Sequence, residues 1–191
     1  MRIDVVDNGG QWTHREWRVL KYLGVESRII PNTTPFDELD VNGLVLSGGA
    51  PRITFEVPKL GLTGEYLERA EFPILGICVG CQFIALHFGG KVGDAETPEY
   101  GKTQITVDVE DEIFKGLPKS FQAWESHNDE IKELPKDFEI LAHSENCAIQ
   151  AFRYLKKPYY GLQFHPEVEH TEHGYEIFKN FIRVCEDYRQ L

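Results

Sequence analysis

The sequence of 191 residues lacks long apolar runs, basic clusters and a dense set of cysteines. No stretch approaches the roughly 20 apolar residues that span a membrane, and an apolar segment starts at Ile3, so we expect neither a membrane helix nor a signal peptide. The formal net charge of -11, with 20 basic against 31 acidic side chains, disfavours binding to nucleic acid or to anionic membranes. Four cysteines without a secretory context favour the cytoplasm over a disulfide framework.

The chain also has no linker, internal repeat or low-complexity stretch. Its length suits one well-buried domain and is short for two. We therefore predict a single domain over residues 1–191. Its single methionine, together with abundant Glu and Lys, is typical of heat-stable proteins.

Apolar strands and amphipathic helices alternate in the first half of the chain. Strands are expected at residues 3–6, 25–30, 43–46 and 74–77, and helices at 12–23, 64–69 and just after residue 78. This alternation predicts a parallel sheet with helices on both faces. Further strands joined by turns, at 103–109, 121–125, 138–143 and 149–152, predict an antiparallel extension of the same domain. Another strand, 159–164, and a helix, 173–188, complete the chain.

Cys78 stands where an apolar strand gives way to a helix. Gly76 and Gly80 flank this turn, as a sharp bend that exposes a nucleophile requires. A thiol at the start of a helix is close to the positive end of the helix dipole, which favours the thiolate. The local pattern therefore indicates a reactive cysteine. The alternative is a small buried apolar side chain, which is the ordinary role of a free cysteine.

A histidine and a carboxylate follow the expected strand at residues 159–164. Pro166 disfavours helix at His165, and residues two apart in an extended segment point the same way. Glu167 can then accept a hydrogen bond from one imidazole nitrogen, leaving the other to take a proton from a thiol. A histidine in a surface turn is the alternative. With the cysteine turn, however, His165 and Glu167 complete a nucleophile, a base and an orienting group.

Three motifs taken together resemble the class I (triad-type) glutamine amidotransferases, which hydrolyse glutamine to glutamate and pass ammonia to a synthetase. The resemblance covers essentially the whole chain and implies an open, mostly parallel, flavodoxin-like α/β sheet with helices on both faces and an antiparallel extension. It also implies a catalytic triad of Cys78, His165 and Glu167. The motifs are Ser47-Gly48-Gly49, Gly76-Ile77-Cys78-Val79-Gly80-Cys81-Gln82 and His165-Pro166-Glu167.

Further segments resemble the glutaminase part of GMP synthases, in particular the separate subunit of archaea. This resemblance implies a partner, an ATP-pyrophosphatase (synthetase) subunit that uses ATP and Mg to convert XMP to GMP, and no cofactor or metal on this chain. Consistent with that division, the loop of residues 47–51 lacks the lysine and second glycine of a phosphate-binding loop. The segments are residues 7–11, 31–35, 124–129 and 168–171.

Other site residues follow from the same resemblance. Backbone amides must stabilise the oxyanion of the tetrahedral intermediate, and those of Gly49 and Val79 are the best candidates. Gln82 is expected to support the glutamine pocket, and Ser126 and His127 to line the substrate or partner face. The alternatives are a plain turn glycine, a glutamine on a helix surface and solvated loop residues.

Two departures from the family pattern leave other hypotheses open. Cys81 creates a C-x-x-C motif with Cys78, which is compatible with redox or metal chemistry, although no second such motif exists. Ala50 stands where proline commonly follows the two glycines, which weakens the expected rigidity of that loop. The competing functions are the glutaminase subunit of another amidotransferase, a cysteine peptidase or deglycase of related fold, and a non-catalytic binding subunit.

Overall fold

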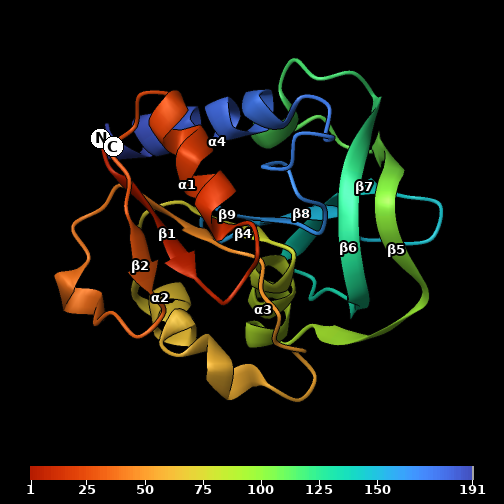
Figure 1. The fold of residues 1–191 in the computed structure, drawn as a ribbon, viewed down its shortest axis with the longest axis horizontal. Coiled ribbons are helices and arrows are strands. Elements are labelled where there is room, and N and C mark those ends of the chain that lie inside the picture. The colour runs from red at the N-terminus through yellow and green to blue at the C-terminus, as the bar shows by residue number, and fades with distance from the viewer. Residues whose placement is uncertain (191) are drawn as a thin grey trace.

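The computed structural model describes residues 1–190 and contains one sheet of nine strands in the order β2-β1-β3-β4-β9-β8-β7-β5-β6. The first five strands of this order are parallel, which confirms the predicted parallel sheet (Figure 1). They are β2 (Ile29–Pro31), β1 (Ile3–Asp7), β3 (Gly43–Leu46), β4 (Ile74–Ile77) and β9 (Tyr159–Leu162).

The remaining four strands are antiparallel and extend the same sheet. Two of them, β5 (Lys91–Val107) and β6 (Ser120–Glu133), form a long ribbon at the sheet edge. The other two, β7 (Phe138–His143) and β8 (Ala151–Tyr154), connect this ribbon to the parallel half. The predicted antiparallel extension is therefore confirmed.

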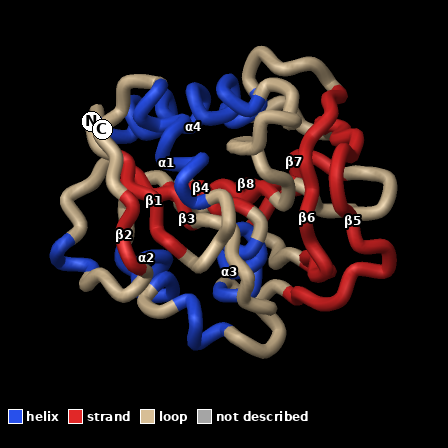
Figure 2. Tube along the Cα trace, viewed as in Figure 1, coloured by secondary structure: helices blue, strands red, loops and turns tan. Residues whose placement is uncertain are grey.

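Helices cover both faces of the parallel half, as predicted. Figure 1 shows α1 (Thr13–Tyr22) and α4 (Gly174–Arg189) along one side of the sheet, and α2 (Thr63–Arg69) and α3 (Val79–His87) along the other. Short 3-10 turns at Phe36–Glu38, Val57–Leu60 and Glu112–Phe114 lie in the connections between these elements. Figure 2 distinguishes the helices, strands and connecting loops by colour. Within residues 1–190, no helix is long and apolar enough to cross a membrane.

The parallel strands are buried because helices pack on both of their faces. Every residue of β3, β4 and β9 is buried, as are the first four residues of β1. Such strands are near-continuous apolar runs without alternation, and this is why the sequence located them well. Their carboxyl ends lie at one edge of the sheet, where sites of α/β proteins form.

Several element boundaries differ from the predicted ones, and the last strand, for example, ends at Leu162 instead of residue 164. The second strand begins at Ile29 instead of residue 25, because residues 25–28 contribute only an isolated bridge between Arg2 and Glu26. The eighth strand covers 151–154 and not 149–152. The ribbon strands are much longer than predicted, since the polar segment 91–102 pairs with β6 without any apolar alternation that a sequence pattern could detect.

Candidate functional site

Cys78 occupies a strained turn between β4 and α3. Its backbone has φ 51 and ψ -107, a conformation that non-glycine residues rarely adopt. The turn is held by a hydrogen bond from the Cys78 amide to the carbonyl of Leu162, at 2.8 Å. The side chain is 5% exposed, at the N-terminus of α3. The predicted sharp strand-to-helix turn is thus confirmed.

The glycines beside this turn are required by close backbone approach. A Cβ atom on Gly80 would lie 2.3 Å from the carbonyl oxygen of Leu46, and one on Gly76 would lie 2.7 Å from the backbone of Gly80. Real Cβ atoms do not tolerate such contacts. The sequence prediction that Gly76 and Gly80 are needed for steric reasons is therefore confirmed.

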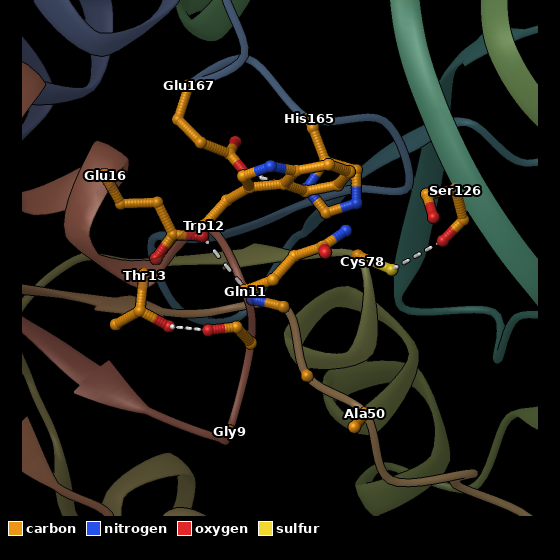
Figure 3. A pocket seen from close by; sticks show the side chains of 13 residues that line it. Gly9, Gln11, Trp12, Thr13, Glu16, Ala50, Cys78, Ser126, His165 and Glu167 are labelled. Carbon is orange, nitrogen blue, oxygen red and sulfur yellow. Dashed lines mark hydrogen bonds and ion pairs between the residues drawn. The ribbon is translucent and has the colours of Figure 1, made fainter.

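His165 and Glu167 form a buried pair at the end of β9. The imidazole Nδ1 lies 2.6 Å from Oε1 of Glu167, and the two residues are 4% and 5% exposed. The backbone amide of His165 donates to the carbonyl of Trp124 at 2.9 Å, which ties this segment to β6. Figure 3 shows the three predicted triad side chains around one cavity, with the imidazole between Glu167 and Cys78.

The charge state of His165 is set by opposing effects. Burial disfavours the imidazolium, but the carboxylate of Glu167 and the neighbouring Cys78 outweigh it, so the pKa of His165 is raised well above its usual value. The ring of Trp12 packs edge-on against the imidazole, with centroids 4.6 Å apart. An imidazolium beside a thiol favours the thiolate, which is the nucleophilic form.

Glu16, on α1, is a second carboxyl group in the cavity, and the sequence patterns did not single it out. It is 1% exposed, and its Oε1 accepts a long hydrogen bond of 3.4 Å from the amide of Gly48. Burial and the nearby charge of Glu167 raise the pKa of Glu16 well above its usual value. Burial therefore favours the neutral form of Glu16. The sequence signal that could have identified Glu16 is an acidic residue on the buried face of an amphipathic helix.

The loop of residues 47–49 packs closely against the loop that follows β1. A Cβ on Gly49 would lie 2.3 Å from the carbonyl oxygen of Asn8, and one on Gly10 would lie 2.4 Å from that of Gly48. The hydroxyl of Ser47 accepts a hydrogen bond from the Asn8 amide at 2.9 Å. These contacts restrain the loop although Ala50 follows the glycines. In the part of the chain that the structure describes, the amides of Gly49 and Val79 donate no hydrogen bond to protein.

Two cavities meet at Cys78 and share part of their lining. The wider, of about 280 Å³, lies on the His165 side and is lined by Gly9, Gly10, Gln11, Trp12, Thr13, Glu16, Gly48, Gly49, Ala50, Cys78, Ser126, His165 and Glu167. The narrower, of about 90 Å³, is lined by Gly49, Ala50, Pro51, Arg52, Cys78, Val79, Gln82, Ser126, His127, Asn128 and Asp129. Cys78 therefore borders both cavities.

The narrow cavity contains opposite charges and an amide. Arg52 pairs with the carboxylates of Asp129 and Asp94, and Asp129 is 5% exposed. Gln82 is 2% exposed and donates to the backbone carbonyl of Asp129 at 2.8 Å. A guanidinium and a carboxylate side by side match the carboxylate and ammonium groups of a free amino acid.

Ser126 and His127 were both expected to line the substrate face, and both border the narrow cavity. The thiol of Cys78 donates a weak hydrogen bond of 3.9 Å to the carbonyl of Ser126. The ring of His127 is engaged elsewhere, since Nδ1 lies 2.9 Å from the carbonyl oxygen of Asp129 and Nε2 lies 2.9 Å from Oε2 of Glu99. Its imidazole is thus directed into the protein interior.

The ring of His127 belongs to a buried polar cluster beneath the ribbon, which comprises Glu99, Glu125, His127, Ser144, Cys147 and Gln150. Ligand atoms of Glu99, His127 and Cys147 lie within 4.8 Å of one another. However, both oxygens of Glu99 accept hydrogen bonds, from Ser144 at 2.6 Å and from Gln150 at 2.7 Å. The thiol of Cys147 donates to the carbonyl of Ile149. These partners engage Glu99 and Cys147, whereas neither carboxylate oxygen of the buried Glu125 has a hydrogen-bond partner among the described residues.

Cys81, the second cysteine of the C-x-x-C motif, is fully buried on α3. Burial raises its pKa well above the usual value, so the thiol stays protonated. A Cβ on Gly161 would lie 2.8 Å from its sulfur, which shows how closely β9 packs on it. Cys81 is therefore part of the helix–sheet packing.

Gln163 was missed by the sequence patterns although it lies two residues before His165. It is fully buried, and its Nε2 lies 3.7 Å from Sγ of Cys78. The available sequence signal was a glutamine within the last expected strand, since an amide side chain in a buried strand needs a hydrogen-bond partner.

Comparison with known proteins agrees with this geometry. A family model described as glutamine amidotransferase class-I matches residues 4–185. The chain is 56% identical over 191 residues to a subunit of GMP synthase (glutamine-hydrolyzing) from Thermoplasma volcanium, covering 100% of this chain and 95% of that protein. It is 51% identical over 187 residues to the protein of the same name from Methanocaldococcus jannaschii, covering 96% of this chain and 97% of the relative.

Solved structures show the same fold. A crystal structure of the corresponding GMP synthase subunit protein from Thermoplasma acidophilum has a TM-score of 0.95 at 56% identity, covering 100% of this chain and 96% of that chain. A glutamine amidotransferase from Thermotoga maritima has a TM-score of 0.76 at 22% identity, over 100% of this chain and 84% of the other, which bears on the fold alone. By family model and by full-length identity, the chain belongs to the class I glutamine amidotransferases, in the group of the glutamine-hydrolysing GMP synthase subunits.

Proposed function

We propose that this chain is the glutaminase subunit of a two-subunit GMP synthase. It hydrolyses glutamine through a thioester on Cys78 and delivers ammonia to a separate ATP-pyrophosphatase subunit that converts XMP to GMP. The observation that carries the proposal is the buried His165–Glu167 pair, joined at 2.6 Å, beside a cysteine in a strained turn. It occurs in a chain that is 56% identical over its full length to glutamine-hydrolysing GMP synthase subunits.

In the first half of the reaction, the thiolate of Cys78 attacks the side-chain amide carbon of glutamine. A carbon–sulfur bond forms, and the amides of Gly49 and Val79 stabilise the oxyanion. The imidazolium of His165 then donates its proton to the amide nitrogen, the carbon–nitrogen bond breaks and ammonia leaves. The raised pKa of His165 suits this step, because the proton is available at neutral pH.

In the second half, water attacks the γ-glutamyl thioester. The neutral imidazole of His165 takes one proton from that water, and the carbon–sulfur bond breaks, which restores the thiolate and the imidazolium. The product leaves as the carboxylic acid and releases its remaining proton to solvent to become glutamate. Glu167 keeps the Nδ1 proton in place, so that the same ring nitrogen serves both proton transfers. Atoms and charge balance over the cycle without a cofactor on this chain.

The substrate fits the narrow cavity by charge. The α-carboxylate of glutamine would be bound near Arg52 and the α-ammonium near Asp129, which directs the side-chain amide toward Cys78. Gln82, Ser126 and His127 would border the bound amino acid. The wider cavity, which contains Trp12 and Glu16, would remain on the side from which ammonia leaves.

The partner follows from the division of labour. The relatives are named as one lettered subunit of GMP synthase, and this chain has no phosphate-binding loop with a lysine in residues 47–51. Use of ATP, magnesium and XMP is therefore assigned to the other subunit. Free glutaminase activity would waste ammonia, so we expect weak activity alone and strong activity in the loaded complex.

The test is a mixture of this chain with the synthetase subunit, ATP, magnesium and XMP. Cys78→Ala should abolish GMP synthesis from glutamine and leave synthesis from added ammonia intact. Cys185→Ala is the matched control, because Cys185 is an equally buried thiol on α4, away from both cavities. The proposal is wrong if ammonia does not rescue Cys78→Ala while the two proteins still bind.

A further inference from the structure

We propose that Gln163 is a further catalytic residue, whose side-chain amide donates a hydrogen bond to the sulfur of Cys78 and stabilises the thiolate. The inference builds on the proposed glutaminase site, and it adds a donor on the side of the sulfur that faces away from both cavities. The Nε2 of Gln163 lies 3.7 Å from Sγ of Cys78, within the range of N–H···S hydrogen bonds.

The orientation of the Gln163 amide is fixed by its neighbours. The Nε2 of Gln82 lies 2.8 Å from the backbone carbonyl of Asp129, and a carbonyl oxygen can only accept. The amide of Gln82 is therefore oriented with its nitrogen toward Asp129. The same nitrogen lies 3.0 Å from Oε1 of Gln163. Since the oxygen of Gln163 faces Gln82, its nitrogen must face Cys78.

The far end of this chain of hydrogen bonds is anchored in the buried polar cluster. His127 also donates from Nδ1 to the carbonyl oxygen of Asp129, at 2.9 Å. That oxygen thus accepts two hydrogen bonds, which restrains the position of the Gln82 amide. Three elements contribute: α3 with Gln82, β6 with His127 and Asp129, and the segment after β9 with Gln163. The donor is held by a network, and its direction does not depend on substrate.

Burial makes this hydrogen bond effective. Gln163 is fully buried and borders neither cavity, so water cannot replace its amide if it is lost. A hydrogen bond to a charged acceptor contributes roughly twice as much as a neutral one. The sulfur of Cys78 therefore has a neutral donor, the Gln163 amide, in addition to the imidazole of His165. The neutral donor stabilises negative charge on sulfur without competing for the proton that His165 must move.

The experiment measures thiolate reactivity directly. Cys78 in the whole chain is alkylated with iodoacetamide at pH 7. Because all four cysteines are buried, the modified residue is identified and quantified by tandem mass spectrometry. Gln163→Leu removes the donor and should slow alkylation about tenfold, the lower end expected for a hydrogen bond to a charged group. With the partner present, kcat for glutamine should fall about tenfold. KM should change little, because Gln163 borders neither cavity.

Gln150→Leu is the matched control, because Gln150 is also a fully buried glutamine but binds Glu99 and Ser144 and not Cys78. It should destabilise the fold to a similar extent and leave the alkylation rate within about twofold of wild type. A purely structural role for Gln163 predicts the same result for both variants. Equal alkylation rates in Gln163→Leu and wild type would overturn the inference.

A second variant keeps the test open if Gln163→Leu does not fold. Gln163→Glu preserves the shape and places an ionisable oxygen against the sulfur, so alkylation at pH 8 should be slower than in wild type by more than tenfold. A rate equal to or above that of wild type would exclude the proposed contact. Absence of glutaminase activity in the wild-type complex would instead contradict the proposed function, and the alkylation series would still decide on Gln163.

Discussion

The parallel and antiparallel halves of the sheet contribute different chemistry to the same site. The parallel half supplies Cys78, the glycine loop after β3 and the buried acid Glu16, and its central strands β3 and β4 are apolar throughout. The antiparallel half supplies Ser126 and Asp129 at the cavity, and beneath them the buried polar cluster around His127. His165 lies where the halves meet, since its amide bonds to Trp124 of β6.

This contrast separates two roles. In the proposed mechanism, groups from the parallel half and its junction make and break bonds, whereas those of the antiparallel half orient the groups that do. Variants in the first set should lose reaction rate with little change in stability. Variants in the buried polar cluster should lose stability first, because an uncompensated buried charge is costly.

The largest effect tests the junction. His165→Ala removes the general acid and base, so glutamine hydrolysis by the complex should fall about 10⁴-fold or more, with GMP synthesis from ammonia retained. His143→Ala is the control, because His143 also pairs with a carboxylate, Asp108, at 2.7 Å but lies half-exposed on β7. Steady-state assay of glutamate release measures both. A fall of less than tenfold in His165→Ala would remove His165 from the mechanism.

Loss of the orienting carboxylate should be less severe. Glu167→Gln is expected to retain about a hundredfold more activity than His165→Ala, because an orienting residue refines a base that is still present. Glu167 also raises the pKa of His165, so the variant should lose its imidazolium at lower pH. The alkaline limb of kcat should therefore move to lower pH. A variant as inactive as Cys78→Ala, with its fold intact, would contradict this assignment.

Within the buried polar cluster, stability should respond before rate. His127→Leu leaves Glu99 without one partner and the Asp129 carbonyl without one donor, so the free energy of unfolding should fall by about 3–5 kcal/mol. The kcat of the folded protein should fall less than tenfold. Urea unfolding gives the first quantity, and His143→Leu, at a half-exposed pair, should cost less than about 1 kcal/mol. A large loss of rate without loss of stability would contradict the orienting role assigned to the antiparallel half.

The smallest effect concerns the pH dependence of stability. Burial and the charge of Glu99 raise the pKa of Glu125, so its native carboxyl binds a proton that the unfolded chain releases. This stabilises the fold at acid pH and is lost as pH rises above the unfolded value of about 4.3. Glu125→Gln should therefore flatten the decline of Tm between pH 5 and 8. Glu145→Gln, at an exposed carboxyl, should keep the wild-type slope, and an unchanged slope in Glu125→Gln would refute the cause.

Sequence patterns located the parallel half well because its signals are local. An apolar run bounded by Gly76 and Gly80 specifies a turn at Cys78, whatever packs around it. Pro166 disfavours helix at the preceding residue, His165, and the chain then turns so that Glu167 contacts the imidazole. No comparable local sequence pattern marks the ribbon of β5 and β6. Residues 91–102 are largely polar and include Pro98, and the stretches 91–94 and 99–102 form a strand only because they pair with β6.

The residues themselves therefore determined the fold class, the strained cysteine and the histidine–glutamate pair, since each depends on neighbours within a few positions. Tertiary structure alone decided which distant groups surround them. It brought Glu16 of α1 against Gly48, turned the ring of His127 away from the cavity, and set Gln163 against the sulfur of Cys78. The reason is that the direction of a buried polar side chain depends on where its hydrogen-bond partners lie, and here those partners are 28 to 85 positions away along the chain.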